Sequence, residues 1–468
     1  MTKIKFGTDG WRAIIAKDFT VENVARVTEA TAVWLNKNFK NPSVVVGHDC
    51  RFAGELFADT VAKVLIANNI KVYLATDYVS TPMVSLGTVT YKANLGIIIT
   101  ASHNPPSYNG YKLKAHYGGP LTPEKVQEVE DIIPAKSSTD LDAISLKDAE
   151  AKGLLIYKDL EELYIQQVEK NFDIAAIKNS GIRFAYDSMY GAGKRVMTRL
   201  FPEITHLHND DNPGFHGQAP EPIHKNLLEF SNLIKSRGDI DCGLCTDGDA
   251  DRIGLYDSKG NFVDSHHIIL LLIHYLVKYK GQKGKVCTAF STTVKIKNIC
   301  AHYNLPLDVV KIGFKYICGI MVTEDVLVGG EESGGIAIKG HIPERDGIWM
   351  GLVIWEFMAK TKKSLNELIN EVYAITGQFW FERNDMHIAE SLKQQIITNC
   401  NNNAYKEFGK YKVNRVEDLD GHKFFFDDNH WMMLRASGTE PVLRIYAEGC
   451  NKAEAFDILE ETKKQLGL

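Results

Sequence analysis

The chain has 468 residues, 44% of them hydrophobic and 24% charged, with a formal net charge of −5. This composition is typical of a globular protein, and the length predicts three or four domains. A weakly acidic chain is not expected to bind nucleic acid, and no apolar stretch reaches the ~18 residues of a membrane span. The opening "MTKIKFGTDGWRA" has no apolar core of a secretory signal. We therefore expect a cytoplasmic protein that acts on small molecules, without a nucleic acid or membrane partner.

Helix and strand signals alternate through the first third of the chain. Apolar residues at helical spacing predict a helix over residues 20–39, with Thr20 as its N-cap. The β-branched run "SVVVGHD", the helical "GELFADTVAKVLIANN" and the strands "KVYLATD" and "LGIIITASHN" follow. This order predicts an α/β layer with mostly parallel strands.

The same pattern begins again twice further along the chain. The second round runs from the helical "LEELYIQQVEKNF" to the strand "DCGLCTD", and the third starts at "HHIILLLIHYLVKYK". The C-terminal part differs, because its strand-like segments "WFERNDMHI", "HKFFFDD", "HWMMLRAS" and "VLRIYAEG" predict an antiparallel sheet with helices between and after them. We predict three α/β domains over residues 1–153, 154–256 and 257–375, and an α+β domain over residues 376–468.

The eight cysteines are scattered along the chain, as is usual in a reducing compartment. Cys242 and Cys245 form a C-x-x-C pattern inside the strand-like "DIDCGLCTDGD". Residues three apart on a strand point to opposite faces of the sheet. We therefore interpret both residues as structural thiols and not as a redox or metal pair.

Four polar turns follow or interrupt predicted strands, which is where ligands collect in α/β sheets. The first is "TASHNP", which contains Ser102 and His103. It does not match G-x-S-x-G, so a nucleophile elbow is not indicated. We interpret Ser102 as the carrier of a phosphate, which would make it a phosphoryl donor. The alternative is a turn whose side chains bond to their own backbone.

The second turn is "TDGDADRIG", in which Asp247, Asp249 and Asp251 alternate with small residues. Three carboxylates this close together favour a hard cation such as Mg²⁺ or Ca²⁺. The turn starts like an EF-hand, but Arg252 stands where that motif needs glycine. A solvated acidic loop is the alternative.

The third turn is the glycine-rich "GGEESGGIAIKGHIPERDGIW". Glu331 and Ser333 could accept and donate hydrogen bonds to sugar hydroxyls. His341 and Arg345 add groups suited to a phosphate or a proton transfer. An ordinary hairpin with exposed charges is the alternative.

The fourth turn is "LRASGTEPVLRIYAE". Its backbone N–H groups and side-chain donors predict an anion site, with two arginines able to hold phosphate oxygens. The candidate residues are Arg435, Ser437, Gly438, Thr439 and Arg444. The alternative is a hairpin with scattered arginines.

Taken together, the motifs are similar to those of one enzyme family. They are "FGTDGWR", "TASHNPPSYNGYK", "YDSMYGAGK", "PEPIHKNL", "DGDADR", "GEESGG" and "RASGTEP", in this order over nearly the whole chain. In this respect the sequence resembles the α-D-phosphohexomutases, which include phosphoglucomutases and phosphomannomutases. The resemblance implies three related α/β domains and a smaller α+β domain arranged around a central cleft.

The resemblance also implies a role for each candidate residue. Ser102 would be the phosphoserine, and the three aspartates would hold Mg²⁺ together with it. Glu331 and Ser333 would bind the sugar hydroxyls, and the fourth turn would hold the phosphate that does not react. Residues implied around the transferred phosphoryl group or the substrate are Arg12, His103, Lys112, Arg252, Lys315, His341 and Arg345.

The implied reaction interconverts glucose 1-phosphate and glucose 6-phosphate through phosphorylated Ser102 and glucose 1,6-bisphosphate, with activity on mannose phosphates left open. Lys112 is a candidate general base if its pKa is lowered. "GEESGG", "GFKYI" and "HIPERDGIW" resemble the glucose type. Gly335 departs from the dual-specificity pattern, which often has histidine, and Arg345 stands where many phosphoglucomutases have lysine.

Several alternatives remain open at the level of the sequence. Phosphomannomutase, phosphoglucosamine mutase and phosphopentomutase belong to the same chemistry. A metal-dependent phosphatase with a serine nucleophile would instead need water at the phosphoserine. A sugar-phosphate-binding protein without catalysis is disfavoured, because Ser102, the acidic triplet and the phosphate loop are all present.

Overall fold

The structure is a computed structural model that describes residues 3–436 and 442–468. The chain forms two compact units. The first contains Met1–Gly284 and Gly313–Leu368, and the second contains Lys285–Ile312 and Ile369–Leu468.

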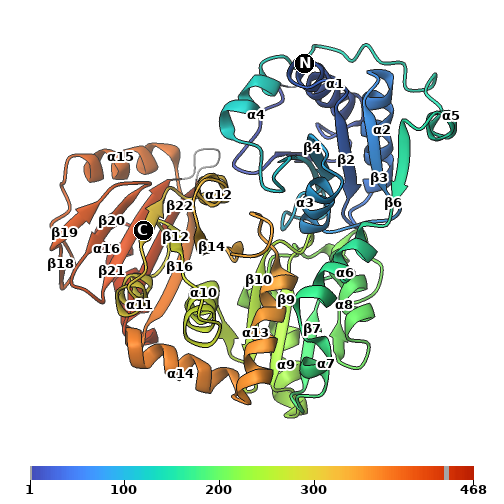
Figure 1. The fold of residues 1–468 in the computed structure, drawn as a ribbon. Helices are drawn as coiled ribbons and strands as arrows, with labels where there is room; N and C mark the ends of the chain where they lie inside the picture. The colour runs from blue at the N-terminus through green and yellow to red at the C-terminus, as the bar shows by residue number, and fades with distance from the viewer. Residues whose placement is uncertain (1–2, 437–441) are drawn as a thin grey trace. The chain divides into compact units, whose positions relative to one another are not determined.

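The first unit begins with a six-stranded mixed sheet, in the order β1-β5-β4-β2-β3-β6. Figure 1 labels strands β4, β2, β3 and β6 of this sheet. Strands β4, β2, β3 and β6 are parallel, whereas β5 is antiparallel to β4 and β1 is antiparallel to β5. The bounds are β1 (Trp11–Ile14), β2 (Ser43–His48), β3 (Lys71–Ala75), β4 (Leu95–Ile99), β5 (Tyr108–Ala115) and β6 (Leu155–Lys158).

Five helices accompany this sheet. They are α1 (Val21–Asn38), α2 (Gly54–Ala67), α3 (Thr81–Thr90), α4 (Pro123–Glu130) and α5 (Leu146–Ala151). Thr20 caps α1 as predicted, because its hydroxyl accepts a hydrogen bond from the Asn23 amide at 3.2 Å.

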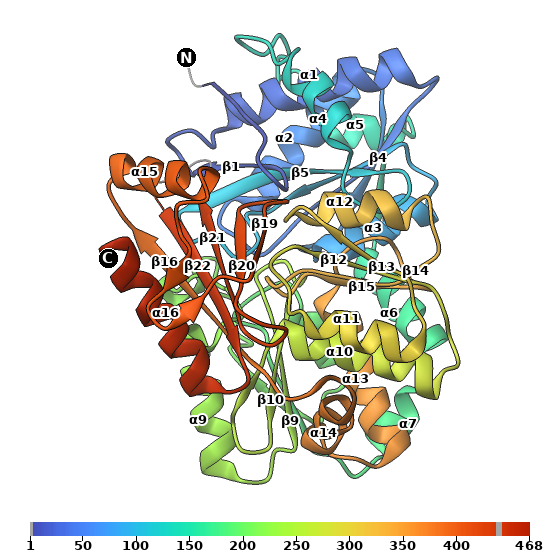
Figure 2. The same cartoon turned by 90° about the vertical axis from the view of Figure 1, so that its left-hand side faces the viewer.

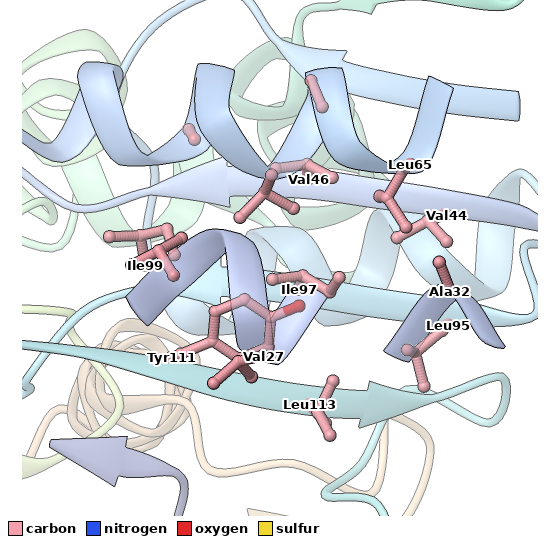
Figure 3. Packing of buried hydrophobic residues seen from close by; sticks show 14 of the residues in the cluster. Val27, Ala32, Val44, Val46, Leu65, Leu95, Ile97, Ile99, Tyr111 and Leu113 are labelled. Atoms are coloured by element: carbon pink, nitrogen blue, oxygen red, sulfur yellow. The ribbon is translucent and has the colours of Figure 1, made fainter. Parts of the chain in front are cut away.

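The core of this sheet follows from strand alternation. Figure 3 shows Leu95, Ile97 and Ile99, the alternate residues of β4, packed among buried side chains of the neighbouring strands and of α1 and α2. All three are fully buried. The packing fixes β4 up to Ile99, so the polar turn that carries Ser102 starts from a rigid strand end.

A second sheet in the same unit has the order β11-β10-β9-β7-β8. Its strands are β7 (Phe184–Asp187), β8 (Thr205–Leu207), β9 (Cys242–Thr246), β10 (Ile253–Asp257) and β11 (Phe262–Val263). Strands β9, β7 and β8 are parallel, and the β9–β10 and β10–β11 pairs are antiparallel. The helices of this segment are α6 (Leu160–Asn171), α7 (Ile174–Lys178), α8 (Lys194–Leu200) and α9 (Leu228–Arg237), with 3₁₀ turns at Phe215–Gly217 and His224–Asn226.

The first unit continues with the third α/β segment. It contains α10 (Ser265–His274), the π-helical turn Tyr275–Tyr279, α12 (Phe314–Met321), β14 (Val326–Gly330), β15 (Ile336–Ile338) and α13 (Gly347–Thr361). Strands β14 and β15 form an antiparallel pair that carries the glycine-rich turn between them.

The second unit is built on an antiparallel sheet in the order β16-β22-β21-β20-β19 (Figure 2). These strands are β16 (Trp380–His387), β19 (Arg415–Glu417), β20 (His422–Phe425), β21 (Trp431–Ala436) and β22 (Val442–Gly449). The unit also contains the parallel pair β12 (Lys285–Ala289) and β13 (Leu307–Val310), the hairpin β17 (Glu407–Phe408) and β18 (Tyr411–Lys412), and the helices α11 (Lys295–Tyr303), α15 (Glu390–Asn401) and α16 (Lys452–Leu466). Helix α14 (Leu365–Thr376) leads into it.

The two faces of this antiparallel sheet have different partners. Met432 and Leu434 pack with residues of α15 and α16, whereas Trp431 and Met433 pack with Phe290. The predicted fold class, α/β segments with mixed sheets followed by an antiparallel-sheet domain, is confirmed. The domain boundaries remain predictions. Among the described residues, the search for a helix long and apolar enough to cross a bilayer finds no candidate.

Candidate functional site

Ser102 lies in the turn that follows β4 and is fully buried. Its φ is 52°, the left-handed region that non-glycine residues rarely adopt. Its amide donates to Thr100 Oγ1 at 2.9 Å, and His103 Nδ1 lies 3.3 Å from its hydroxyl. The pKa of His103 is lowered well below its ordinary value by burial and by nearby cations, Arg252 first among them. His103 is therefore neutral beside the serine.

Arg51, which follows β2, donates hydrogen bonds to the backbone of this turn. Its guanidinium donates to the backbone carbonyls of Ser102 at 2.5 Å and Asn104 at 2.7 Å, and more weakly to those of Pro105 and Tyr108. Four carbonyls on one buried cation leave the turn little freedom.

Asp49, two residues earlier, extends the support. It lies 3.4 Å from Arg51 Nε and accepts a hydrogen bond from Thr100 Oγ1 at 2.5 Å. The backbone of Ser102 is thus fixed at both its amide, through Thr100, and its carbonyl, through Arg51.

The acidic triplet lies in the turn between β9 and β10 and meets this serine. Ser102 Oγ donates to Asp247 Oδ2 at 2.6 Å. Carboxylate oxygens of Asp247, Asp249 and Asp251 all lie within 4.8 Å of one another, and all three residues are fully buried. Two chain segments 145 residues apart therefore meet at one point.

The charges of the triplet are only partly balanced. Burial, followed by Asp249 and Asp251, raises the pKa of Asp247 well above its ordinary value. Burial would also raise the pKa of Asp249, but Lys112 lowers it below the usual range. Asp249 Oδ1 and Asp251 Oδ1 are buried and have no hydrogen-bond partner among the described residues. Such an arrangement of oxygens fits a hard divalent cation.

Lys112, on β5, is the cation nearest to the triplet. Its Nζ lies 2.7 Å from Asp249 Oδ2, 3.2 Å from Asp251 Oδ2 and 3.0 Å from Asp9 Oδ2. Burial alone would lower the pKa of Lys112, but the three carboxylates raise it above its ordinary value. The lowered pKa that a lysine base requires is therefore not found at Lys112.

Arg345 joins the same network from the segment before α13. Its guanidinium lies 2.8 Å from Asp251 Oδ2 and also pairs with Asp9. A Cβ built on Gly335 would lie 2.4 Å from Arg345 Cδ, so this arginine occupies the space of a side chain at position 335. Gly335 and Arg345, the two departures from the family pattern noted in the sequence, are therefore linked. The Arg345 side chain fits against position 335 because glycine has no side chain there.

Glu331 closes the glycine-rich turn. Its Oε1 accepts a hydrogen bond from the Gly313 amide at 2.8 Å, and its own amide donates to Gly335 O. Burial raises the pKa of its carboxyl, although Arg345 opposes the effect. Ser333, two residues on, is half-buried.

His341 does not join the acidic network. Its Nε2 lies 2.9 Å from Asp346 Oδ2, and its ring stacks on Trp349 at 3.7 Å. Asp346 is the N-cap of α13 and also accepts a hydrogen bond from Tyr164. His341 therefore packs behind the site and supports α13.

Of the other basic candidates, Arg12 and Arg252 lie beside the Ser102 turn and the acidic triplet, whereas Lys315 lies near Asp9. Arg12 donates to Asn104 Oδ1 at 2.5 Å. The Arg252 amide donates to Asp247 Oδ1 at 3.0 Å, which places Arg252 beside the triplet. Lys315 lines a pocket together with Asp9.

The predicted phosphate turn belongs to the second unit. Arg435 and Arg444 are directly opposite each other on β21 and β22, so they share one face of the sheet. Arg435 Nε pairs with Asp420 at 3.1 Å, and Arg444 Nε lies 3.7 Å from Asp385. Ser437, Gly438 and Thr439 lie outside the described residues.

The two cysteines of the C-x-x-C pattern lie on β9 and are buried. Burial raises the pKa of Cys242 to about 12 and that of Cys245 well above its ordinary value. Neither thiol is poised to ionise, in agreement with their interpretation as structural residues.

Sequence reasoning did not single out several residues of the network. Asp49 and Arg51 follow β2 at the same sheet edge as Ser102. Their position just after a predicted strand could have identified them as candidates. Asp9 and Glu344 stand inside motifs already quoted, "FGTDGWR" and "HIPERDGIW". Glu344 pairs with buried Lys114 at 2.6 Å, and this contact between distant segments has no local signature.

Comparison with known families identifies the family of the chain. Sequence models of phosphoglucomutase/phosphomannomutase match domain I over residues 3–140, domain II over 162–260, domain III over 264–375 and the C-terminal domain over 398–465. The chain belongs to this family. Its members are the α-D-phosphohexomutases, so the protein is an enzyme, an isomerase that transfers a phosphoryl group.

Individual relatives span nearly the whole chain. A phosphoglucomutase/phosphomannomutase of Thermococcus kodakarensis is 29% identical, with 97% of this chain and 96% of the relative covered. A phosphoglucosamine/phosphogalactosamine mutase of Sulfurisphaera tokodaii is 28% identical, with 98% of both covered. Among solved structures, a protein of Thermus thermophilus assigned as a phosphomannomutase is 31% identical, covers 100% of both chains and has a TM-score of 0.88.

Proposed function

We propose that this family member is a Mg²⁺-dependent phosphohexomutase that interconverts the 1- and 6-phosphates of glucose through phosphorylated Ser102. The observation that carries the proposal is the hydrogen bond of 2.6 Å between Ser102 Oγ and Asp247, at a triplet with two buried, unpartnered carboxylate oxygens among the described residues. This arrangement joins a phosphoryl carrier to a cation site in one place.

The serine supplies and receives the phosphoryl group. In the first half-reaction the bond between Ser102 Oγ and phosphorus breaks, a bond from O6 of glucose 1-phosphate to phosphorus forms, and the hydroxyl proton passes to a base. The product is glucose 1,6-bisphosphate, which turns around. In the second half-reaction the bond between O1 and its phosphorus breaks, a bond from Ser102 Oγ to that phosphorus forms, the proton returns from the base to O1, and glucose 6-phosphate leaves.

The chain holds and orients the reacting groups. Asp247, Asp249 and Asp251 would hold Mg²⁺, which, when bound, supplies positive charge next to the phosphoryl oxygens. Lys112 and Arg345 add fixed positive charge at the same place, because both are ion-paired with Asp9 and with the triplet. Preorganised charge of this kind stabilises the transition state of phosphoryl transfer.

Substrate binding falls to the remaining motifs. Glu331 and Ser333 would hydrogen-bond the sugar hydroxyls, with Glu331 held in place by the Gly313 amide. Arg435 and Arg444, opposite each other on one sheet face, would hold the phosphate that does not react together with Ser437, Gly438 and Thr439. One site for hydroxyl groups and one site for an anion together support a sugar phosphate as the class of substrate.

A second substrate is also supported. Relatives of similar identity include a dual phosphoglucomutase/phosphomannomutase and a phosphoglucosamine/phosphogalactosamine mutase. We therefore include mannose and glucosamine phosphates as alternative substrates of the same site.

A panel of 1-phosphates of glucose, mannose, glucosamine and ribose, with Mg²⁺ and a trace of the matching bisphosphate, tests the proposal. We expect the glucose compound to give the highest kcat/KM and free phosphate to be a minor product. A higher kcat/KM for the 1-phosphate of another sugar would identify that compound as the preferred substrate. Free phosphate as the main product would indicate a phosphatase. Intact-mass analysis tests the carrier, because the phosphoryl adduct should be absent in Ser102→Ala.

A further inference from the structure

A second cluster of metal-ligating side chains lies in the second unit. His430 is in the turn between β20 and β21, Cys450 follows β22, and Glu454 is in the first turn of α16. Ligand atoms of these three residues all lie within 4.8 Å of one another. The cluster shares no residue with the phosphohexomutase site described above.

The histidine ring is already oriented as in a metal site. His430 Nδ1 lies 2.8 Å from Asp427 Oδ2, and His430 Nε2 lies 2.8 Å from Glu454 Oε2. Asp427 is fixed in turn, because its Oδ1 accepts hydrogen bonds from the amides of Asn429 and His430. In a metal site, a histidine commonly binds the ion through one ring nitrogen and donates a hydrogen bond from the other ring nitrogen to a carboxylate. Asp427 could be that carboxylate here.

Part of this geometry has an ordinary explanation. Asn451 is the N-cap of α16, and its side chain accepts a hydrogen bond from the Glu454 amide. Glu454 accepts in return from the Cys450 amide at 2.8 Å, which completes an arrangement like a capping box. The helix cap explains the position of the Glu454 side chain, but it requires neither the thiol of Cys450 nor the imidazole of His430.

We propose that His430, Cys450 and Glu454 bind a zinc ion, or another divalent cation with the same preference for mixed ligands. Nitrogen, thiolate and carboxylate donors together suit zinc, and poorly suit magnesium. Three protein ligands leave one position for water. The side chains of His430 and Glu454 are 20% and 39% exposed, so an ion can enter from solvent.

Binding has a defined proton balance and a structural consequence. The ion replaces the proton of the Cys450 thiol and the proton shared by His430 Nε2 and Glu454, and both leave to solvent. The metal then ties the β20–β21 turn to the start of α16, two segments that His430 and Glu454 already join through a polar contact.

The site should affect stability more than turnover. Trp431 pairs with Glu448 at the end of the sheet next to the cluster, whereas Ala436 pairs with Leu443 at the opposite end. Arg435 and Arg444, the described residues of the predicted phosphate site, pair near that opposite end. A metal at the cluster therefore lies at the other end of these strands from this arginine pair.

Titration of the full chain with Co²⁺, in the presence of excess Mg²⁺ to occupy the aspartate triplet, tests the proposal. A thiolate ligand gives an intense near-ultraviolet charge-transfer band that oxygen ligands do not give. We expect the band in the wild type and its loss in Cys450→Ser. Cys50→Ser is the matched control, because Cys50 is the other half-buried cysteine and should leave the band unchanged.

Competition against a chromogenic chelator gives the affinity for Zn²⁺. His430→Gln and Glu454→Gln should each weaken binding about tenfold or more, and Asp427→Asn should weaken it by about 10–100-fold. His208→Gln is the control, since His208 also lies between two carboxylates but belongs to the first unit, whereas the cluster belongs to the second. Zn²⁺ should also raise the thermal midpoint of the wild type and not that of Cys450→Ser.

The proposal is overturned if the wild type shows no charge-transfer band, or if Cys450→Ser keeps both the band and the Zn²⁺ affinity. If Asp249→Asn loses Zn²⁺ binding and Cys450→Ser keeps it in full, the ion binds at the aspartate triplet, and the proposal is also overturned. If Cys450→Ser does not fold, as judged by circular dichroism, His430→Gln provides the same comparison. None of these outcomes depends on mutase activity.

Discussion

Ser102 adopts a left-handed backbone conformation, which costs about 1–3 kcal/mol for a residue with a side chain. Surrounding contacts must offset this cost. The bonds from Arg51 to four backbone carbonyls and from the Ser102 amide to Thr100 do so. The reactive hydroxyl is therefore placed by residues outside the set that would bind the substrate.

Arg51 is accordingly a positioning residue. Arg51→Lys keeps the charge but cannot reach four carbonyls, so we expect kcat to fall about 100-fold with little change in KM. The phosphoryl adduct on Ser102 should form more slowly in the same variant. Steady-state kinetics and intact-mass time courses measure both effects.

Arg183→Lys serves as the control, because Arg183 is exposed on the surface of the same unit. An Arg51→Lys enzyme with wild-type kcat would show that the turn holds its shape without this cation. A loss of thermal stability with unchanged kcat would assign Arg51 a purely structural role.

The contact between Gly335 and Arg345 leads to a second prediction. Gly335→Ala places a methyl group where Arg345 Cδ lies, so the guanidinium must move away from Asp9 and Asp251. We expect kcat to fall about tenfold or more, because a fixed positive charge at the acidic network is displaced. Gly319→Ala is the control, since nothing lies within 4 Å of the added methyl group there. Wild-type kcat in Gly335→Ala would contradict the assignment of Arg345.

At the residue scale, the sequence singled out the serine and the triplet as candidates because each stands in a short motif with a chemical meaning. It could not predict that Lys112 is surrounded by Asp9, Asp249 and Asp251. The pKa of a lysine depends on neighbours that the fold brings from distant segments, and no local pattern records them.

At the scale of elements, helices with a clear apolar period were predicted well, as α1 and its cap at Thr20 show. Strand pairing was less accessible. Trp11 of β1 pairs with Tyr111 of β5, and this antiparallel edge depends on contacts between segments far apart in the chain. Local propensity predicts that a strand forms, but packing decides which strand it joins.

One strand of the second unit carries an unusual buried cation. Lys423 on β20 is 4% exposed, and its ammonium lies 3.6 Å from the centre of the Trp431 ring. It donates to the carbonyls of Phe290 and Thr292. Burial lowers the pKa of Lys423 from 10.5 to about 8, although the acidic side chain of Glu448 opposes this.

This lowered pKa predicts how stability depends on pH. Between pH 8 and 10.5 the unfolded chain binds the lysine proton more than the folded chain does, so the free energy of unfolding rises with pH in that window. The change corresponds to about 3 kcal/mol over the whole window. Below about pH 8 both states are protonated, so Lys423 adds no pH dependence there.

Denaturant unfolding of the wild type and of Lys423→Met, measured from about pH 7 to about pH 10.5, isolates this contribution from those of other groups. The stability of the wild type relative to the variant should increase steadily above about pH 8. A difference that stays constant across the window would mean that Lys423 keeps an ordinary pKa.

On the scale of the whole molecule, the sequence predicted the family because its motifs occur in order over nearly the entire chain. It did not determine the preferred sugar, because relatives of nearly equal identity bear the names of different mutases. Specificity depends on a few contacts in the substrate site, and the number of shared residues says little about them.

The acidic triplet couples ligand binding to the stability of the first unit. Mg²⁺ that binds only the folded chain should stabilise it by about 2.7 kcal/mol at about 100 times its dissociation constant. Asp247→Asn should abolish most of this gain. Without Mg²⁺ the same variant should be at least as stable as the wild type, because asparagine replaces a carboxyl whose charged form is disfavoured by burial and by Asp249 and Asp251. The amide oxygen can still accept from the Asp251 and Arg252 amides.

Unfolding curves with and without Mg²⁺, for the wild type, Asp247→Asn and the exposed-site control Asp239→Asn, measure both effects. The control should keep the full gain, since Asp239 pairs with Arg237 on the surface. An Asp247→Asn protein that is much less stable without Mg²⁺ would show that the triplet is a structural hydrogen-bond centre. An Mg²⁺ gain equal to that of the wild type would remove Asp247 from the cation site. The predicted combination is equal or higher stability without the ion and little gain with it, as expected if the fold holds the three carboxyl groups together to bind a cation at a cost in stability.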